Sequence, residues 1–321
     1  MAFVRFSNES LQKEPERLET LRKRHAILAA IRRFFDAQGF VEVETPCVVL
    51  SPGLERNLDA LEVIGAGRTK FLNTSPEYHM KRLLVAGLPR IYQICKCFRR
   101  DERGPLHQTE FTMLEWYRCV ADWNDLMRDT EELVAIVAGT INNGTTRIRG
   151  RYAPIDLTPP WERISVAAAF QRYADTNLDD LLPDEERFYR LLVERVEPRL
   201  GRERPVFLTH YPADMACLAR LDPADPKVAE RFEAYVDGIE LCNGFSELAD
   251  PEEQKRRFEN ELRARRASGK IEYPVDQRFI SALERGLPEC GGNALGVDRL
   301  IMLILGANRI DEVMAFSETD L

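Results

Sequence analysis

The pattern of apolar and polar residues near the start of the chain predicts a helix followed by a strand. From His25 to Gln38 the apolar residues recur at intervals of three and four, which is typical of an amphipathic helix. Gly39 suits the left-handed backbone that often ends a helix. Residues 41–44 then alternate apolar and acidic side chains as a strand does, and Pro46 ends that pattern.

A second pair of strands is predicted further along the chain. Residues 91–98 and 110–120 both have strand-like patterns, and the polar stretch 99–109 lies between them. Two strands that flank such a loop favour an antiparallel hairpin. The polar residues 1–20, in contrast, predict a loose arm or a short helix.

The second half of the chain mixes helical and strand patterns without regular alternation. Residues 122–200 are mostly charged and helical in pattern, which predicts helices on a sheet together with a variable insertion. Because strict βαβ units are absent, this order favours an α+β fold with a largely antiparallel sheet. The remaining predicted elements are strands at 205–211 and 240–248, helices at 226–238 and 251–270, and a glycine-rich strand that leads into an apolar helix at 291–306.

Composition narrows the class of protein. The chain has 321 residues, of which 44% are hydrophobic, so it can form one large core or two medium ones. Its net charge of −8 argues mildly against a primary nucleic-acid binder, although a local basic patch stays possible. Seven cysteines without a C-x-x-C pair predict free, buried thiols in a reducing compartment. Without a signal-like or membrane-spanning apolar run, a cytoplasmic protein is expected.

Chemically useful side chains gather on the predicted hairpin. Since side chains alternate across a strand, Phe111, Met113, Glu115 and Tyr117 share one face, as the lining of a pocket would. Arg99 ends the neighbouring strand, where a guanidinium group can bind a phosphate with two hydrogen bonds. Each residue alone could equally form a surface ion pair, but the combination favours a pocket.

Two further clusters lie near the end of the chain. Glu240 and Glu247 are seven residues apart, and Glu233 lies seven residues before Glu240. Carboxylates that converge on a phosphate need a hard cation between them, most plausibly Mg²⁺. The glycine-rich run 291–296 lets a ligand approach the backbone and places Arg299 near the N-terminus of a helix. Taken alone, the acidic cluster is a weak signal, and the glycine run is better explained as a tight turn.

Taken together and in this order, the clusters resemble the motifs of class II aminoacyl-tRNA synthetases, specifically the lysine enzymes. Residues 24–46 look like motif 1, 98–117 like motif 2 and 296–300 like motif 3, while 74–83 and 243–248 match lysine-specific signatures. The resemblance implies the class II catalytic fold, with a mostly antiparallel sheet of six or seven strands flanked by helices. Motif 1 also implies a homodimer.

A shorter group within this family, the lysine ligases that modify elongation factor P, is similar to the chain over nearly its whole length. About 20 residues precede motif 1, and a domain needs roughly 50. We therefore expect a single catalytic domain over residues 1–321, without an anticodon-binding domain. Ala294 stands where lysyl-tRNA synthetases carry glycine, and its methyl group is expected to favour β-lysine over α-lysine.

The resemblance implies a role for each candidate residue. Arg99 would hold the α-phosphate of a bent ATP and Arg299 its γ-phosphate, with Mg²⁺ on Glu233 and Glu240; Arg99, Arg299 and Glu240 would be catalytic. The other nucleotide-binding residues would be Arg100, Asp101, His107, Gln108, Phe111, Leu241 and Gly296. The lysine slot would comprise Ser75, Pro76, Glu77, Glu115, Tyr117, Asn243, Glu247 and Ala294.

Three positions depart from the family pattern. Asp101 stands where the family usually has glutamate, and Gln108 and Thr109 stand where it usually has Asn-Pro, so a weaker affinity for ATP is expected. Since a dibasic substrate is best recognised by buried acids that a wrong substrate would leave unpaired, the implied slot suits lysine or β-lysine.

The implied reaction has two steps: lysine is activated as an adenylate, and the lysyl group then passes to a lysine ε-amine of elongation factor P. Two alternatives remain. A minimal enzyme that charges tRNA is disfavoured by the acidic net charge, and a non-catalytic lysine-binding regulator is disfavoured by Arg99, Glu240 and Arg299. The basic stretch 255–270 is interpreted as a solvated helix with internal glutamate partners rather than a docking surface.

Overall fold

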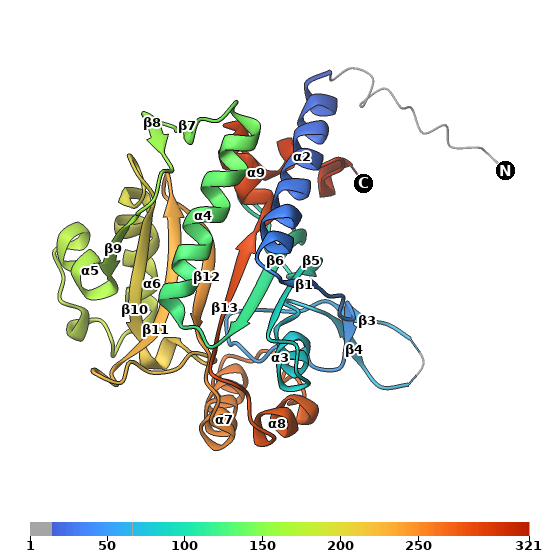
Figure 1. Ribbon diagram of the computed structural model, residues 1–321. Helices are drawn as coiled ribbons and strands as arrows, with labels where there is room; N and C mark the ends of the chain where they lie inside the picture. Colours follow the sequence, from blue (N-terminus) through green and yellow to red (C-terminus); the bar gives the residue numbers. More distant parts are fainter. Residues whose placement is uncertain (1–14, 66, 321) are drawn as a thin grey trace.

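An eight-stranded sheet forms the centre of the computed structural model, which describes residues 15–65 and 67–320 (Figure 1). Its strand order is β1-β5-β6-β13-β12-β11-β10-β9. The two edge pairs, β1 with β5 and β9 with β10, are parallel, and the five pairs between them are antiparallel. The strands are β1 (Val41–Glu42), β5 (Arg90–Phe98), β6 (Glu110–Cys119), β9 (Glu162–Ser165), β10 (Val206–Pro212), β11 (Val228–Val236), β12 (Ile239–Ser246) and β13 (Cys290–Gly296).

This architecture confirms the α+β fold and the hairpin of β5 and β6, with eight strands rather than six or seven. Two small sheets add to it: one of β2 (Val48–Val49), β4 (Lys70–Leu72) and β3 (Glu62–Val63), and one of β7 (Arg147–Arg149) and β8 (Pro154–Asp156). Within the described ranges, no helix is both long enough and apolar enough to span a membrane.

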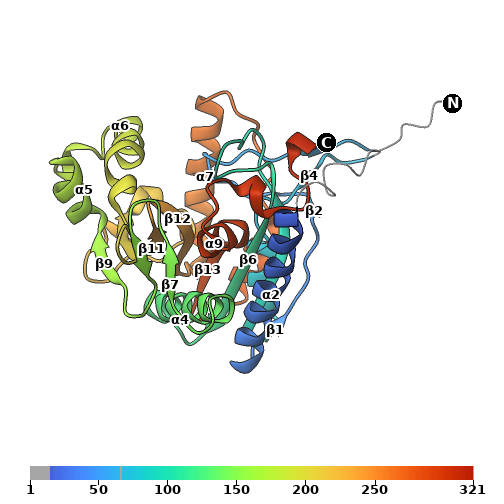
Figure 2. The same ribbon diagram turned by 90° about the horizontal axis from the view of Figure 1, so that it is seen from above.

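Helices cover both faces of the sheet. One face packs against α2 (Pro15–Ala37), α4 (Trp123–Ile141) and α9 (Val297–Leu305) around a large apolar cluster. On the other side a second cluster involves α3 (Glu77–Val85), α7 (Pro251–Ala267) and α8 (Gln277–Glu284). Seen from above, α2 and α4 lie on one side of the sheet and α7 on the opposite side (Figure 2).

The segment 142–200 is less helical than its pattern predicted. It contributes β7, β8 and the edge strand β9 before α5 (Val166–Ala174) and α6 (Glu185–Leu191), which pack with β10 in a separate apolar cluster. The short helical turns are η1 (Leu178–Asp180), η2 (Leu192–Val196), η3 (Glu197–Arg199), η4 (Ala213–Met215), η5 (Ile310–Val313) and η6 (Glu318–Asp320).

The predicted helix at 226–238 is wrong, because these residues form β11. Alanine and glutamate favour a helix, but the segment lies between β10 and β12 and is hydrogen-bonded to both. Burial on both faces of a central strand outweighs the weak helical propensity.

Other boundaries moved by a few residues. The first predicted helix begins at Pro15 rather than near His25, and Gly39 ends it with a φ of +74° as expected. Of the predicted strand 41–44, two residues form β1, and the Val43 N–H still donates to the Tyr92 carbonyl. Residues 1–14 of the predicted arm lie outside the described residues.

All seven cysteines are free thiols, as predicted, but not all of them are buried. Cys97, Cys242 and Cys290 are buried, whereas Cys47 is exposed. The prediction that the basic stretch in and after α7 is a solvated helix with glutamate partners holds only in part: Arg256 pairs with Glu253 at the surface, whereas the Arg265 side chain is fully buried. The other ion pairs join Lys255 to Glu252, Arg257 to Glu253, Arg265 to Asp59, Arg266 to Glu272 and Lys270 to Asp59.

Candidate active site

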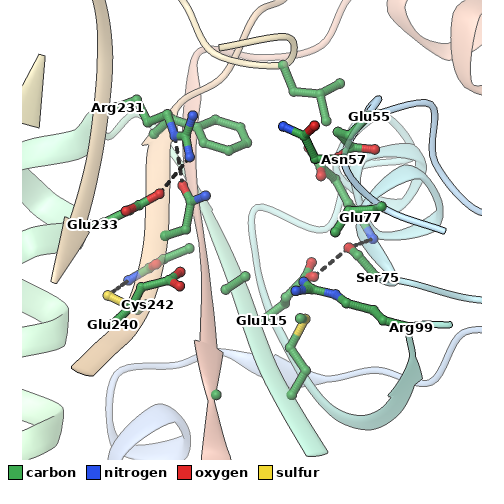
Figure 3. Close-up of a pocket in the computed structure, with 18 of the residues that line it drawn as sticks. Glu55, Asn57, Ser75, Glu77, Arg99, Glu115, Arg231, Glu233, Glu240 and Cys242 are labelled. Atoms are coloured by element: carbon green, nitrogen blue, oxygen red, sulfur yellow. Dashed lines mark hydrogen bonds and ion pairs between the residues drawn. The ribbon is translucent and has the colours of Figure 1, made fainter. Parts of the chain in front are cut away.

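A cavity of about 450 Å³ lies on the side of the sheet opposite α2 and α4, lined by β6, β11, β12, β13 and adjoining loops. Arg99 and Arg299 both line it, so the two predicted phosphate-binding groups share one space. Figure 3 shows Arg99 on one side of this cavity and Glu240 on the other. The other predicted residues that line it are Ser75, Glu77, His107, Gln108, Phe111, Glu115, Tyr117, Glu233, Glu240, Leu241, Asn243, Ala294 and Gly296.

Strand geometry explains how these residues meet. Along β6, Phe111, Glu115 and Tyr117 face the cavity, while Leu114 and Trp116 pack in the core on the opposite face, as the alternation predicted. Across the sheet, Ala294 of β13 pairs with Glu115 on one side and with Asn243 of β12 on the other. Three separate chain segments therefore place their side chains next to one another.

Glu115 is the central acid of the predicted lysine slot. Its carboxylate accepts hydrogen bonds from the Ser75 hydroxyl at 2.5 Å and from the Tyr117 hydroxyl at 3.0 Å. Burial, and next the negative charge of Glu77, raises its pKa to about 8. An empty cavity thus favours the protonated carboxyl group, and a bound ammonium group would favour the carboxylate.

Lys81 supplies an internal cation beside this slot. Its Nζ lies 2.5 Å from an oxygen of Glu77 and 2.5 Å from an oxygen of Glu247. Burial opposes the charged amine, but Glu247 and Glu77 outweigh that effect and raise its pKa. Glu77 lines the cavity, whereas Glu247 lies behind Gly292.

Gly292 keeps the wall between Glu247 and the cavity thin. A Cβ at this position would lie 2.3 Å from the Glu247 Oε1 and 2.3 Å from Tyr117 Cε1, closer than real Cβ contacts allow. The glycine run was interpreted as a tight turn, but it forms strand β13, and the absence of a side chain at Gly292 is a steric requirement of the slot.

Arg299 is held at the other end of the cavity. Its guanidinium donates to the Glu240 carbonyl at 2.8 Å, lies 3.2 Å from the Glu240 carboxylate, and contacts His107 Nε2 at 2.8 Å. Burial and the charge of Arg299 lower the pKa of His107, so its neutral ring accepts this hydrogen bond. The arginine is thereby oriented before any anion binds.

Arg99 lies on the opposite wall and has fewer contacts. Its guanidinium stacks over the Phe111 ring at 5.1 Å and lies 3.7 Å from Glu102. Its Nε is buried without a hydrogen-bond partner among the described residues. A donor in this state fits an incoming phosphate oxygen.

The two acids predicted to hold a metal differ in their surroundings. The buried Glu233 carboxylate accepts from Tyr211 at 2.5 Å, Tyr235 at 2.7 Å and Arg231 at 2.7 Å. Burial, and next the charge of Glu240, raises its pKa. No cluster of three His, Cys, Asp or Glu side chains suited to a metal occurs in the described part of the chain. Two carboxylates still fit Mg²⁺, which takes its other ligands from phosphates and water.

Sequence comparison now identifies the family. The model of the class II tRNA synthetases (D, K and N) matches residues 4–320. The chain belongs to the class II tRNA synthetase family. Among curated proteins it is 42% identical over 327 aligned positions to an elongation factor P–(R)-β-lysine ligase of Klebsiella pneumoniae (strain 342). That alignment covers 94% of this chain and 95% of the relative.

Four predicted residues of this class II site do not line the cavity. Asp101 is exposed at a φ of +62°, and the neighbouring Glu102 lines the cavity instead. The backbone N–H of Arg100 donates to the carbonyl of Asp59. Pro76 precedes α3 and accepts hydrogen bonds from its first turn, and Glu247 lies behind the wall as described above.

Sequence reasoning also missed residues that complete the site. Arg231 lies two positions before Glu233 on β11, and this spacing could have placed both on one face of a strand had the segment not been assigned to a helix. Glu55 and Asn57 come from an irregular loop, for which no periodic pattern gives a signal.

Proposed function

We propose that the protein is an ATP-dependent ligase that activates lysine, with β-lysine preferred, and transfers it to a lysine ε-amine of elongation factor P. The observation that carries the proposal is the single cavity in which Arg99 and Arg299 adjoin an acid-lined slot. The name of the relative, matched over nearly the full length of both chains, supports the acceptor and the isomer.

In the first step an oxygen of the lysine carboxylate attacks the α-phosphorus of ATP. The bond between that phosphorus and its bridging oxygen breaks, and pyrophosphate leaves. Arg99 and Arg299 stabilise the charge that develops, while Glu77 and Glu115 hold the donor by its amines. Most of the acceleration comes from holding the carboxylate in line with the leaving group.

In the second step the acceptor amine attacks the carbonyl carbon of the adenylate. The acceptor enters as an ammonium ion and loses one proton before its lone pair can attack. A C–N bond then forms, the bond from the carbonyl carbon to the phosphate oxygen breaks, and the second proton leaves as AMP departs. The products are AMP and an amide, which needs no covalent enzyme intermediate.

Mg²⁺ is part of this proposal. Glu240 would be its main protein ligand because its side chain is 39% exposed, and Glu233 would use the one lone pair left by its three donors. The ion would neutralise charge on the ATP phosphates.

A homodimer and a single catalytic domain are also proposed. The edge strand β1 and the segment after it expose apolar side chains at Val41, Val48 and Leu50, each more than 40% accessible. Their exposure supports the dimer, because a second copy would bury these side chains. Four neighbouring strands of one sheet line the site together, which supports a single catalytic domain.

Pyrophosphate exchange into ATP tests this proposal. We expect exchange with a lysine isomer, and separate measurements with α-lysine and both β-lysine enantiomers rank the three donors. We also expect transfer to elongation factor P but not to tRNA. Arg99→Ala should reduce exchange by several orders of magnitude, whereas the surface variant Arg172→Ala should keep it. Exchange without transfer to elongation factor P, or charging of tRNA alone, would contradict the assigned acceptor.

A further inference from the structure

Glu55 is an acidic residue of the cavity to which the family resemblance assigns no role. It lies on the loop between β2 and β3 and lines the same cavity as Glu77 and Glu115. In the close-up it lies on the same side of the cavity as Glu77 (Figure 3). Its Oε2 is buried and accepts no hydrogen bond from any residue between 15 and 320 that the structure describes.

The acids around Glu55 all have partners. Glu77 is paired with Lys81, and Glu261 is paired with Arg56 at 2.7 Å. Glu115 accepts two hydroxyl donors, as described above. Because a buried carboxylate is costly without a donor, Glu55 is the acid of this group that still requires one.

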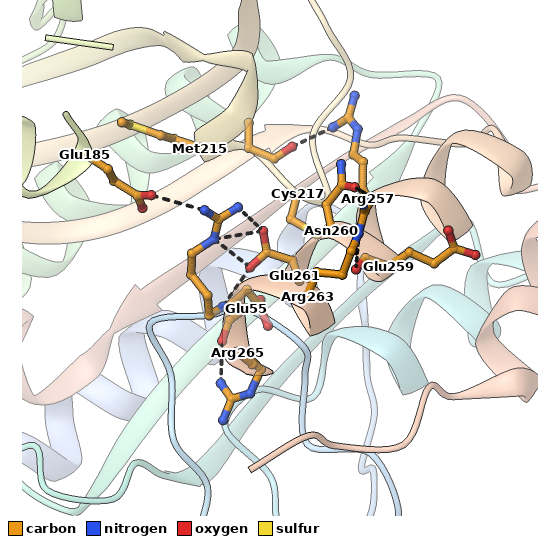
Figure 4. A network of polar contacts seen from close by, with 12 residues as sticks. Glu55, Glu185, Met215, Cys217, Arg257, Glu259, Asn260, Glu261, Arg263 and Arg265 are labelled. Atoms are coloured by element: carbon orange, nitrogen blue, oxygen red, sulfur yellow. Dashed lines mark hydrogen bonds and ion pairs between the residues drawn. The ribbon is translucent and has the colours of Figure 1, made fainter. Parts of the chain in front are cut away.

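The loop that carries Glu55 is fixed on both sides (Figure 4). Arg265 of α7 donates to the carbonyl groups of Glu55 at 3.0 Å and Leu58 at 2.8 Å. The next backbone N–H, of Arg56, donates to Glu261 at 2.8 Å. These contacts hold the Glu55 backbone in place before a ligand arrives, which reduces the entropy lost on binding.

Gly53 gives the carboxyl group its room. It has a φ of +123°, and a Cβ there would lie 2.8 Å from Glu55 Oε2 and 3.2 Å from the Thr74 hydroxyl. The position of the Glu55 carboxyl group therefore depends on a residue without a side chain two positions earlier.

We propose that Glu55 determines donor specificity by receiving, beside Glu77, one of the two ammonium groups of the diamine. This proposal rests on the function proposed above. The diamine brings two positive charges to the slot. Lys81 carries one positive charge, which balances one of the two negative charges of Glu77 and Glu247. Glu115 and Glu55 then remain as the two carboxyl groups without a cationic partner.

The charges that face Glu55 agree with this role. Burial, then the charges of Glu77 and Glu261, raises its pKa to about 7, while its own backbone N–H and Arg99 act in the opposite direction. The other titratable groups near it, Tyr78 and Cys217, are uncharged because burial raises the pKa of each. A bound ammonium group would lower the pKa of Glu55 and so act against the effect of burial.

The test is pyrophosphate exchange by Glu55→Gln, which keeps the size of the side chain and removes its charge. For the preferred diamine we expect KM to rise about 10- to 100-fold with kcat changed less than about threefold. Of two monoamine analogues of β-lysine, 6-aminohexanoate and 3-aminohexanoate, the one that lacks the amine bound by Glu55 should show an unchanged KM. Glu259→Gln, at an exposed position of α7, is the matched control and should behave as the unmodified protein.

Three results would overturn the proposal. An unchanged KM for the diamine would remove Glu55 from donor binding. Normal exchange with slow transfer to elongation factor P would assign Glu55 to the acceptor step. An equal rise in KM for both monoamine analogues would indicate a general distortion of the site. Glu55→Asp is an independent check for such a distortion, and we expect it to give an intermediate KM for the diamine. Failure of the unmodified protein to exchange pyrophosphate would refute the proposed function itself.

Discussion

Affinity for the diamine donor should depend strongly on pH, because Glu115 must ionise to bind an ammonium group. Glu115 is 2% exposed, and burial together with the charge of Glu77 raises the pKa of its carboxyl group to about 8 in the empty cavity. Ionising it before binding costs about 2.7 kcal/mol at pH 6 and about 1.4 kcal/mol at pH 7. The ionisation of Glu115 alone should therefore lower the dissociation constant about tenfold from pH 6 to pH 7, and about fivefold more by pH 8.

The sign of the effect on stability follows from the same pKa. A carboxyl group whose pKa is raised in the folded protein stabilises it below the ordinary pKa of about 4.5, and this contribution is lost as pH rises towards 8. The empty protein should thus lose stability between pH 5 and pH 8. A bound diamine should restore it, so its thermal stabilisation should grow with pH in this range.

Isothermal titration calorimetry with the donor alone, in buffers of different ionisation enthalpy, measures both affinity and proton release. Near pH 7 we expect Glu115 to contribute about 0.9 of a proton to the release per donor bound, falling to about half a proton at pH 8. Glu115→Gln should bind more weakly and lose most of this proton release. A dissociation constant that stays flat from pH 6 to pH 8, with no proton release, would refute the reasoning.

Two further substitutions test other parts of the slot. Ala294→Gly should shift the ratio of kcat/KM values towards α-lysine, since it removes a methyl group between Glu115 and Asn243, and an unchanged ratio would exclude Ala294 from isomer selection. Lys81→Met leaves the buried Glu247 and the partly buried Glu77 without their cation. It should lower the free energy of unfolding in urea by about 3–5 kcal/mol at pH 8, and by less at pH 5, whereas Lys96→Met, at an exposed position, should lower it by under about 1 kcal/mol.

The sequence was most informative where a local pattern and the fold agree. Two-residue alternation placed Glu115 and Tyr117 on the face that became the cavity wall and Trp116 on the core face. The hairpin also formed where it was predicted, because a long apolar strand on each side of a polar loop has few alternative pairings. For these residues, the alternation along the strand was sufficient to predict which side chains point into the cavity and which point into the core.

Prediction from the local sequence failed where contacts with distant parts of the chain determine the structure. The β11 segment is a strand because β10 and β12 bind it from both sides, and its own residues give weak evidence of that. Glu247 was expected inside the slot, but Lys81 and the wall at Gly292 hold it just behind. The position of Glu55 depends on Arg265, 210 residues away, which no local pattern reveals.

The internal cation explains how such an acidic slot can fold before its substrate arrives. Without Lys81, the partly buried Glu77 and the buried Glu247 would repel each other with no counter-charge, whereas the Lys81 Nζ lies 2.5 Å from an oxygen of each. Lys81 cannot also satisfy Glu115, whose raised pKa leaves it protonated in the empty cavity. A monoamine would leave one of the remaining carboxyl groups without a cation, and neutral amino acids would leave more. Discrimination in favour of a diamine therefore follows from the acids that the folded protein leaves without a cation.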